Sequence, residues 1–414
     1  KWFQVFGMTF TKGDILTKLS FFIMGLSNLA RGQIIKGLLF LFVEAAYVIY
    51  MIQYGISSFI GLRTLGTKTQ GMVMVPKVVK GKTVQIAELQ PGDNSMLMLL
   101  AGVVAISVTL VFIIIWRASL KAAMEAQQIK ARGEKLPSFA DDVRTYFDAK
   151  LHRTLMALPL TGILLFTVLP LFFMILIAFT NYDHDHQPPG NLFTWIGFKN
   201  FYTILFSGET IANTFWPVLG WTVTWAIFAT FLNYIFGILL ALLINKKDIK
   251  WKGFWRTIFV ISIAIPQFVS LLVVRTMLKD DGAINNLLRQ LGFLGQGDYL
   301  PFLSHPTWAR VTVIIVNLWI GIPYTMLITT GILSNIPSDL YESARVDGAN
   351  RFVMFFKITM PYVLFVTTPY LITQFIGNLN NFNVIYFLTA GDPKTLDYYQ
   401  AGKTDLLVTW LYKL

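Results

Sequence analysis

Amide side chains recur inside two of the most apolar stretches of the chain. Asn317 stands in one of them, close to Gly321 and Tyr324, and the uncharged stretch 362–391 contains several more. Because hydrocarbon makes polar groups costly, such amides normally face a cavity or another helix. Amides donate and accept hydrogen bonds, and aromatic faces stack on sugar rings, so the pattern suits a neutral, hydroxyl-rich ligand. Hydrogen bonds between neighbouring helices would explain the amides equally well.

Other residues that could do chemistry give weaker signals. The absence of cysteine excludes disulfides, thiol catalysis and cysteine-ligated metals. An ATP-binding loop needs G-x4-G-K-[ST], and both Gly81-Lys82-Thr83 and Gly402-Lys403-Thr404 lack the leading glycine. The run from Asp183 to His186 has the residue types of a weak metal site, but a solvated turn explains it better. We therefore expect no enzyme activity, no bound cofactor and no metal in this chain.

Lipid must be the solvent for much of this 414-residue chain. Hydrophobic residues make up 55% of it and charged residues only 14%, whereas a soluble domain carries about 25% charged residues. About 20 apolar residues cross the hydrocarbon core of a bilayer. The sequence therefore predicts an all-α integral membrane protein, a polytopic helical bundle with seven complete spans and a truncated eighth that begins near Leu406. The seven runs are about 34–54, 95–116, 155–179, 215–245, 257–278, 309–333 and 362–389.

The distribution of Lys and Arg predicts the orientation. Segments 1–36, 117–153, 246–256 and 334–361 hold about twice as many basic residues as the segments on the other side. The positive-inside rule places these segments, and with them the N-terminus, in the cytoplasm. The net charge of +12 has the same explanation, so it does not indicate a nucleic-acid partner.

The segments between the spans also have recognisable patterns. Residues from Asp14 to Gln33 mix apolar and basic types, which predicts a helix in the cytoplasmic interface. Alternation in residues 70–85 predicts an external β-hairpin, and the second span is expected to continue as a helix until Gly133 and Pro137 interrupt it. The predicted parts are the N-terminal segment 1–33, the first two spans 34–116 with external loop 55–94, the cytoplasmic loop 117–153, and the core 154–414 with the inner loop 334–361.

That inner loop reads as two short helices. Ser338 is placed to cap the first, and Gly348 is placed to end it in the left-handed conformation. The second helix begins at about Arg351 and is expected to stop before Pro361. A rigid helix-turn-helix beyond the membrane is typical of a docking element.

The same loop resembles the cytoplasmic signature of ABC importer permeases, E-A-A, three residues, G, nine residues, then I-x-L-P. The matching residues are Glu342, Ser343, Ala344, Gly348, Ile358 and Pro361, with Ser343 in place of alanine and Met360 in place of leucine. The resemblance extends from about residue 155 to the end and is to the MalF type of maltose and maltodextrin permease. It is carried by residues 317–324, 377–382, 388–393 and 404–408. The resemblance implies the MetI-like fold of type I importers.

In that family, separate subunits bind the solute, carry it across the membrane and supply the energy for transport. The resemblance implies an extracellular solute-binding protein, a second permease of the MalG type, and two cytoplasmic ATPase subunits that use ATP and Mg. It implies ATPase coupling by Glu342, Ser343, Ala344, Asp347, Gly348, Ala349, Ile358 and Pro361. It also implies an oligosaccharide midway across the bilayer, bound by Asn317, Gly321, Tyr324, Gln374, Gly377, Asn378 and Asn381.

Two departures from the family leave the sugar open. Gln374 and Gly377 stand where a small hydroxyl residue and a larger aromatic would be expected, so raffinose- or galactan-type oligosaccharides are alternatives to maltodextrin. The outer loop 180–213 lacks the large inserted domain of some relatives, which implies the plasma membrane of a Gram-positive-type bacterium. An ion-coupled secondary transporter is a further alternative, but it would need paired carboxylates in the spans, where only Glu44 is available.

Overall fold

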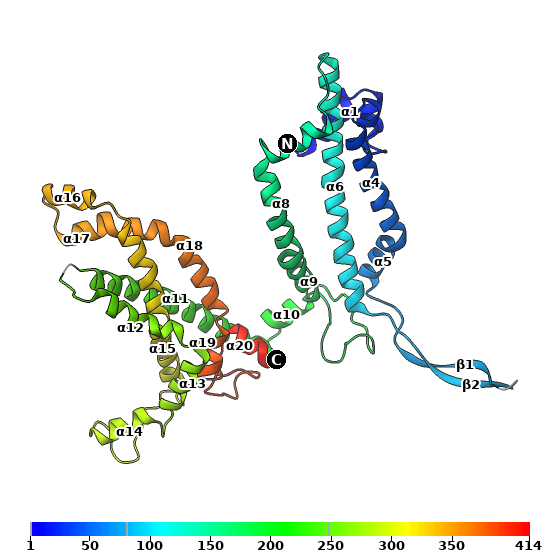
Figure 1. Ribbon diagram of the computed structural model, residues 1–414. Helices are drawn as coiled ribbons and strands as arrows, with labels where there is room; N and C mark the ends of the chain where they lie inside the picture. The colour runs from blue at the N-terminus through cyan, green and yellow to red at the C-terminus, as the bar shows by residue number, and fades with distance from the viewer. Residues whose placement is uncertain (1, 80–81, 247) are drawn as a thin grey trace. The chain divides into compact units, whose positions relative to one another are not determined.

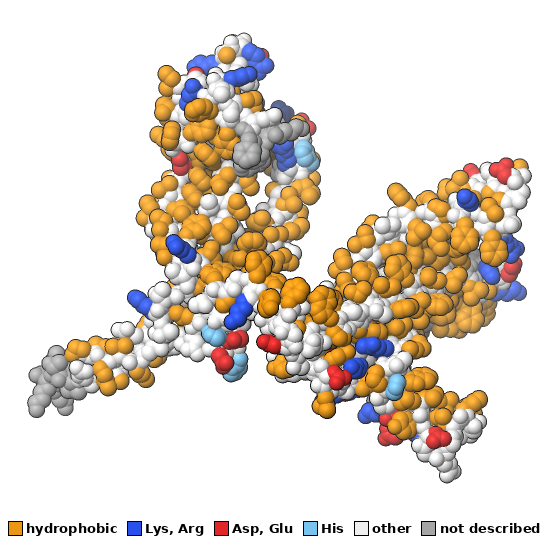
Figure 2. Space-filling model, turned by 180° about the vertical axis from the view of Figure 1, so that it is seen from behind, with side chains coloured by type: hydrophobic (Ala, Val, Ile, Leu, Met, Phe, Trp, Pro, Cys, Tyr) orange, Lys and Arg blue, Asp and Glu red, His pale blue; other side chains and the backbone are white. Residues whose placement is uncertain are grey.

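The computed structural model describes residues 2–79, 82–246 and 248–414. The chain forms two compact units, Lys1–Asn200 and Phe201–Leu414. The helices of both units are coloured in chain order in Figure 1. Hydrophobic side chains cover most of the visible surface of each unit, and charged side chains gather mainly near the ends of the helices (Figure 2). Such a surface is suited to lipid rather than to water.

The first unit is built on helices that are long enough to cross a bilayer. Helix α4 (Ile34–Tyr50) continues through a π-helical turn, η1 (Met51–Gly55), into α5 (Ile56–Thr64). Helix α6 (Ser95–Ala131) begins where the Asn94 side chain accepts the Met96 and Leu97 N–H groups. Helix α8 (Leu151–Ile163) runs through η2 (Leu164–Val168) into α9 (Leu169–Ile177). These three segments match the first three predicted spans.

The connecting segments of this unit follow the predicted patterns with one difference. The hairpin consists of β1 (Gly71–Val79) and β2 (Lys82–Gln90), paired antiparallel. Helix α6 ends at Ala131, Gly133 has a φ of +75°, and α7 (Phe139–Phe147) begins after Pro137. The N-terminal stretch is not one interfacial helix, because Gly25, with a φ of +79°, separates two short ones. The N-terminal helices are α1 (Trp2–Lys12), α2 (Ile15–Leu19) and α3 (Leu26–Ala30).

The second unit packs around α11 (Thr210–Asn245) and α15 (Pro306–Ser334). These two helices approach closely because Gly237 of α11 lies against Thr325 of α15, where any side chain would overlap it. Trp225 is fully buried between the helices of this unit, in a core with Leu271, Val313 and Leu388. The other helices are α10 (Lys199–Phe206), which crosses the boundary between the units, α12 (Lys252–Ala264), α13 (Gln267–Met277), α14 (Ala283–Gln290), α16 (Ser338–Val346), α17 (Arg351–Met354), η3 (Phe355–Thr359), α18 (Met360–Leu379), α19 (Phe382–Leu388) and α20 (Leu407–Lys413).

Two of the predicted spans are not continuous helices. Within the described ranges, 6 helical segments are long and apolar enough to cross a membrane, or 7 if the bent pair α12 and α13 is one span. That pair, predicted as the single run 257–278, bends by 90° at Ile265 and Pro266. The predicted run 362–389 ends its long helix at Leu379 and continues only in the short α19. The stretch predicted to begin an eighth span forms the short helix α20.

Candidate functional site

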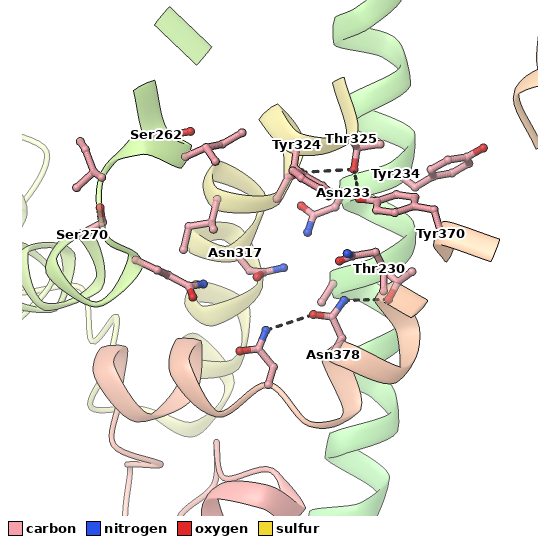
Figure 3. Close-up of a pocket in the computed structure, with 18 of the residues that line it drawn as sticks. Thr230, Asn233, Tyr234, Ser262, Ser270, Asn317, Tyr324, Thr325, Tyr370 and Asn378 are labelled. Atoms are coloured by element: carbon pink, nitrogen blue, oxygen red, sulfur yellow. Dashed lines mark hydrogen bonds between the residues drawn. The ribbon is translucent and has the colours of Figure 1, made fainter. Parts of the chain in front are cut away.

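A cavity of about 500 Å³ lies inside the second unit, between α11, α15, α18 and the bend that joins α12 to α13. Six of the seven residues predicted to contact a ligand line it: Asn317, Gly321, Tyr324, Gln374, Asn378 and Asn381. Figure 3 shows Asn317 of α15 and Asn378 of α18 at this cavity. The cavity lining has no Asp, Glu, Lys, Arg or His among the residues that the structure describes. A ligand held here would therefore meet neutral hydrogen-bonding groups and aromatic rings.

Two breaks in the helices form part of the cavity wall. A proline disfavours the α conformation of the residue before it, and Ile265 accordingly has φ −82° and ψ 130°. Ile265 and Pro266 therefore line the cavity as extended backbone. The second break follows Leu379, and Asn381 begins α19 by accepting the Val384 N–H at 3.2 Å. Irregular backbone is tolerated at membrane depth where it lines a cavity, and both breaks fit that condition.

Asn378 holds one side of the cavity together. Its Nδ2 donates to Thr230 Oγ1 at 3.0 Å, and its Oδ1 accepts from Asn381 Nδ2 at 3.2 Å (Figure 3). The indole N–H of Trp225 donates to the Asn378 backbone carbonyl at 3.1 Å. Asn378 is therefore positioned by three partners and is only 7% exposed. Its amide forms the helix–helix hydrogen bonds that the sequence left as an alternative to ligand binding.

Two other amides of the cavity are incompletely satisfied. The Nδ2 of Asn317 and the Oδ1 of Asn233 are buried and have no hydrogen-bond partner in the described residues. Asn317 is only 4% exposed, and its side chain points toward the cavity (Figure 3). An unsatisfied buried polar group costs about 1–3 kcal/mol. One unpaired donor and one unpaired acceptor at the same cavity are suited to a ligand rich in hydroxyl groups.

Aromatic residues form another part of the wall. The rings of Tyr324 and Tyr370 lie 5.9 Å apart, with an interplanar angle of 41°. The Tyr370 hydroxyl and Thr325 Oγ1 are 3.0 Å apart (Figure 3), which fixes the Tyr370 ring, whereas Tyr324 is 48% exposed. An exposed aromatic face beside fixed polar groups is the kind of surface on which a sugar ring stacks.

Gly321 is required by its contact with α11. A side chain at this position would overlap the amide of Asn233. Gly377 is different, because it is exposed, does not line the cavity, and has no atom within 4 Å of the point that a Cβ would occupy. It follows Ile376 and precedes Asn378 on α18, turned by about 100° from Asn378 around the helix axis. The predicted contact between Gly377 and a ligand is thus not part of this cavity.

Several polar and aromatic residues of the cavity were not predicted from the sequence. These are the polar residues Thr230, Asn233, Ser262, Gln267, Ser270 and Thr325 and the aromatic residues Tyr234 and Tyr370. A signal for Ser262, Gln267 and Ser270 was present in Pro266, since a span broken there exposes the residues on both sides of the break. Thr230, Asn233 and Tyr234 lie close together in one apolar stretch, but nothing near them in the sequence indicates that Asn233 faces Gly321.

The inner loop forms the two predicted helices, with differences at their ends. Gly348 has a φ of +78° and ends α16, and the Ala349 N–H closes the turn on the Ala344 carbonyl at 2.8 Å. Ser338 does not cap α16, because the helix already begins at Ser338 and Pro337 precedes it. The other helix of the loop, α17, does have a side-chain cap, because Asn350 accepts the Val353 N–H at 2.9 Å.

The second helix of the loop does not stop before Pro361. It runs from Arg351 through the π-helical turn η3 into α18. Proline would clash with the carbonyl four residues earlier, and the wider turn, in which Met360 N–H bonds the Phe355 carbonyl, accommodates it. The residues predicted to couple to an ATPase lie on α16, in its turn, and at the start of this continuous helix. Glu342, Ser343, Asp347 and Gly348 are exposed, and Ala344, Ala349 and Ile358 are half-buried.

The remaining motifs have no ligand-binding geometry. His186 Nδ1 lies 2.7 Å from Asp183 Oδ1 in an exposed turn, and no group of three or more metal-binding side chains occurs in the described ranges. Lys403 contacts the Tyr398 ring, and its carbonyl accepts from the Arg310 side chain at 2.9 Å. The Gly81 of the other candidate nucleotide motif lies outside the described residues.

Long apolar helices and a neutral polar cavity are the features of a multi-pass membrane protein with an internal binding site. Residues 233–400 match the family described as the binding-protein-dependent transport system inner membrane component. The chain is 36% identical to the galactooligosaccharides transport system permease protein GanP of Bacillus subtilis, over 95% of this chain and 88% of the relative. It is 35% identical to the maltodextrin transport system permease protein MdxF of the same organism, over 98% and 89% respectively. The chain therefore belongs to the family of binding-protein-dependent transport system permeases, and the predicted family and fold class are confirmed.

Two further similarities cover less of the molecule. The chain is 37% identical to the maltose/maltodextrin transport system permease protein MalF of Escherichia coli, over 59% of this chain and 46% of the relative. Among solved structures it is similar to a bacterial ABC transporter involved in the import of alginate, with a TM-score of 0.46 and 26% identity over 65% of this chain and 85% of that chain.

Proposed function

We propose that this chain is the permease subunit of an ATP-driven importer and that it carries a neutral oligosaccharide through the cavity of its second unit. The observation that carries the proposal is the lining itself. It combines unpaired amide atoms on Asn317 and Asn233 with the Tyr324 ring and has no charged side chain in the described residues. Hydroxyl groups satisfy both a donor and an acceptor, whereas an acidic sugar would bring a charge with no partner.

The sugar class is proposed from the relatives. A maltodextrin transport permease and a galactooligosaccharides transport permease are almost equally similar to the chain, at 35% and 36% identity. Both names describe oligosaccharides, and the neutral cavity suits the neutral members of that class. The identities favour neither sugar, so maltodextrin and a galactooligosaccharide are both proposed as candidates.

Energy is proposed to come from separate ATPase subunits that bind the inner loop 334–361. The loop exposes apolar side chains that a folded protein normally covers: Val346 is 88% exposed, Phe352 76% and Phe356 61%. The Tyr341 hydroxyl lies 2.9 Å from Thr359 Oγ1 and ties α16 to η3, directly before α18. An element that is continuous with a cavity-lining helix can transmit a displacement to the cavity. ATP and Mg would bind the ATPase subunits and not this chain.

The alternative of ion-coupled transport has little support in the described residues. Glu44 accepts the Met24 backbone N–H at 2.7 Å, and it belongs to the first unit rather than to the cavity. A proton- or sodium-coupled carrier needs ionisable groups near its substrate. The proposed complex also contains a second permease and an extracellular solute-binding protein, and it lies in a bacterial plasma membrane of Gram-positive type with the N-terminus in the cytoplasm.

The decisive experiment is ATP hydrolysis by the importer purified with this chain and reconstituted in proteoliposomes. Maltodextrins, galactooligosaccharides and acidic oligosaccharides are each supplied with the cognate binding protein. We expect a neutral oligosaccharide to stimulate hydrolysis and the acidic one to have no effect. Purification of the chain without any ATPase subunit under several mild conditions, together with uptake that continues when ATP is depleted, would refute the proposal.

A further inference from the structure

A second cavity lies in the first unit, and none of its residues belongs to the substrate cavity or to the inner loop. It is formed by residues 31–36, where α3 leads into α4, and by residues 130–142, where α6 leads into α7. Its volume is about 730 Å³. The Gln33 Nε2 donates to the Pro137 carbonyl at 3.1 Å and joins the two segments, so that the cavity has a fixed wall.

The charges around this cavity are unbalanced. Its lining contains the basic residues Arg31, Lys36, Lys130 and Lys135. Arg31 is paired with Asp14 at 2.6 Å, and Lys36 is paired with Asp142 at 2.9 Å. Lys130 and Lys135 form no ion pair or side-chain hydrogen bond with any residue in the described ranges, and both are exposed.

The acidic residues of the lining do not compensate these two lysines. Glu134 lies 3.5 Å from the side chain of Arg132, and Asp142 is engaged by Lys36. The cavity therefore presents two ammonium groups that are available to an anion. Each ammonium group is carried on a flexible stem of four carbons, so that its position can adjust to a bound phosphate.

An apolar surface begins at the edge of the same cavity. Ile34 and Ile35 line it and are 60% and 51% exposed, and Leu38 and Leu39 continue the surface along α4 with 51% and 52% exposure. Ile34 is also the first residue of a segment that is long and apolar enough to cross a membrane. The lysines thus stand where the hydrocarbon-facing part of α4 begins, which is the level of lipid headgroups.

We propose that this cavity binds an anionic phospholipid, with the headgroup phosphate between Lys130 and Lys135 and the acyl chains along the exposed side chains of α4. A soluble phosphate would use the lysines but would leave Ile34 and Ile35 in water. Two lysines without a partner in the described ranges, next to an exposed apolar strip, therefore favour a lipid over a free anion.

The test uses the importer purified with the full chain and native mass spectrometry of bound lipid. The detergent solution contains phosphatidylglycerol and phosphatidylcholine with identical acyl chains in equal amounts. We expect phosphatidylglycerol to be retained preferentially. Lys130→Gln with Lys135→Gln should reduce that preference by about thirtyfold, since each basic residue near an anionic surface contributes about fivefold.

A matched control removes the same charge from the N-terminal segment of the first unit. Lys12→Gln with Lys18→Gln changes two exposed lysines that do not line the cavity, and it should leave the preference unchanged. Ile34→Asn with Ile35→Asn should weaken phosphatidylglycerol retention without changing the binding of inorganic phosphate. Equal losses in the two lysine variants, no preference in the unaltered protein, or displacement of the lipid by millimolar inorganic phosphate would each overturn the proposal.

Discussion

Replacing Asn317 by leucine should stabilise the second unit while impairing transport. Asn317 is 4% exposed, and its Nδ2 has no partner in the described residues. Leucine has a similar volume and removes the unpaired donor, whose burial costs about 1–3 kcal/mol. The lower end of that range corresponds to a rise in Tm of about 2–4 °C for a unit of about 200 residues. Uptake should fall, because the cavity loses a group that would bind a sugar hydroxyl.

The same substitution at Asn378 should have the opposite effect on stability. The Asn378 amide has two partners, and its loss takes the hydrogen bond to Asn378 from Thr230 Oγ1 and from Asn381 Nδ2 beside the cavity. A decrease in stability of about 1–3 kcal/mol is expected. The bond from Trp225 is made to the backbone carbonyl of Asn378 and remains available in the variant, so that α18 keeps one of its contacts with α11.

Both variants are measured in the purified importer by thermal unfolding and, after reconstitution, by sugar-dependent ATP hydrolysis. A rise in Tm for Asn317→Leu and a fall for Asn378→Leu, with lower sugar-dependent hydrolysis in both, is the expected result. A fall in Tm for Asn317→Leu as large as that for Asn378→Leu would show that Asn317 Nδ2 is satisfied in the protein. Unchanged hydrolysis in both variants would refute the placement of the sugar in this cavity.

Three further predictions concern other parts of the chain. Glu342→Lys, on the exposed face of α16, should abolish sugar-dependent ATP hydrolysis while the protein remains inserted in the membrane, and loss of the protein from the membrane would contradict a coupling role. Gly321→Val should displace the Asn233 amide and reduce uptake at least tenfold. Gly377→Val should have little effect, because no atom lies within 4 Å of an added Cβ. Equal uptake in the two variants would contradict the close packing at Gly321. Backbone N–H groups at the base of the hairpin hold the pKa of Asp93 below its usual range. The ionised Asp93 therefore stabilises the folded protein at any pH above the ordinary Asp pKa of about 4. This contribution is lost as the pH falls through the lower pKa of the folded state. Limited proteolysis of the hairpin should accordingly increase only in strong acid, and an increase already at pH 6 would count against this.

The spacing of the lining residues is the feature of the site that the sequence shows most directly. Asn317, Gly321 and Tyr324 are four and three residues apart, and Gln374, Asn378 and Asn381 repeat that spacing. Residues at these intervals share one face of a helix, which brings Asn317, Gly321 and Tyr324 of α15 and Gln374 and Asn378 of α18 to one cavity. Asn381 lies beyond the end of α18 and reaches the cavity from the break that follows Leu379. Gly377 does not belong to this series, and its position away from the cavity follows from the same geometry.

The breaks in the helices could not be predicted from hydropathy alone. Pro159, Pro217, Pro323 and Pro369 all lie inside helices that continue, whereas the helix breaks at Pro266. A proline removes one hydrogen bond and restricts its predecessor, but neighbouring helices can compensate for both effects. Whether a helix bends or breaks therefore depends on tertiary packing, and the sequence pattern is the same in both cases.

The two breaks give the cavity its chemical character. A bundle of unbroken apolar helices would offer a ligand only side chains, because every backbone group would be used within its own helix. At Ile265 and Pro266 the chain is extended, and beyond Leu379 the Asn381 side chain starts a new helix. Ser262, Gln267 and Ser270 then reach the cavity from both sides of the first break. Local loss of helix thus adds polar groups to a cavity whose other polar side chains come from the continuous helices α11, α15 and α18. The exposed loop after α15 is joined to this cavity without interruption through η3 and α18.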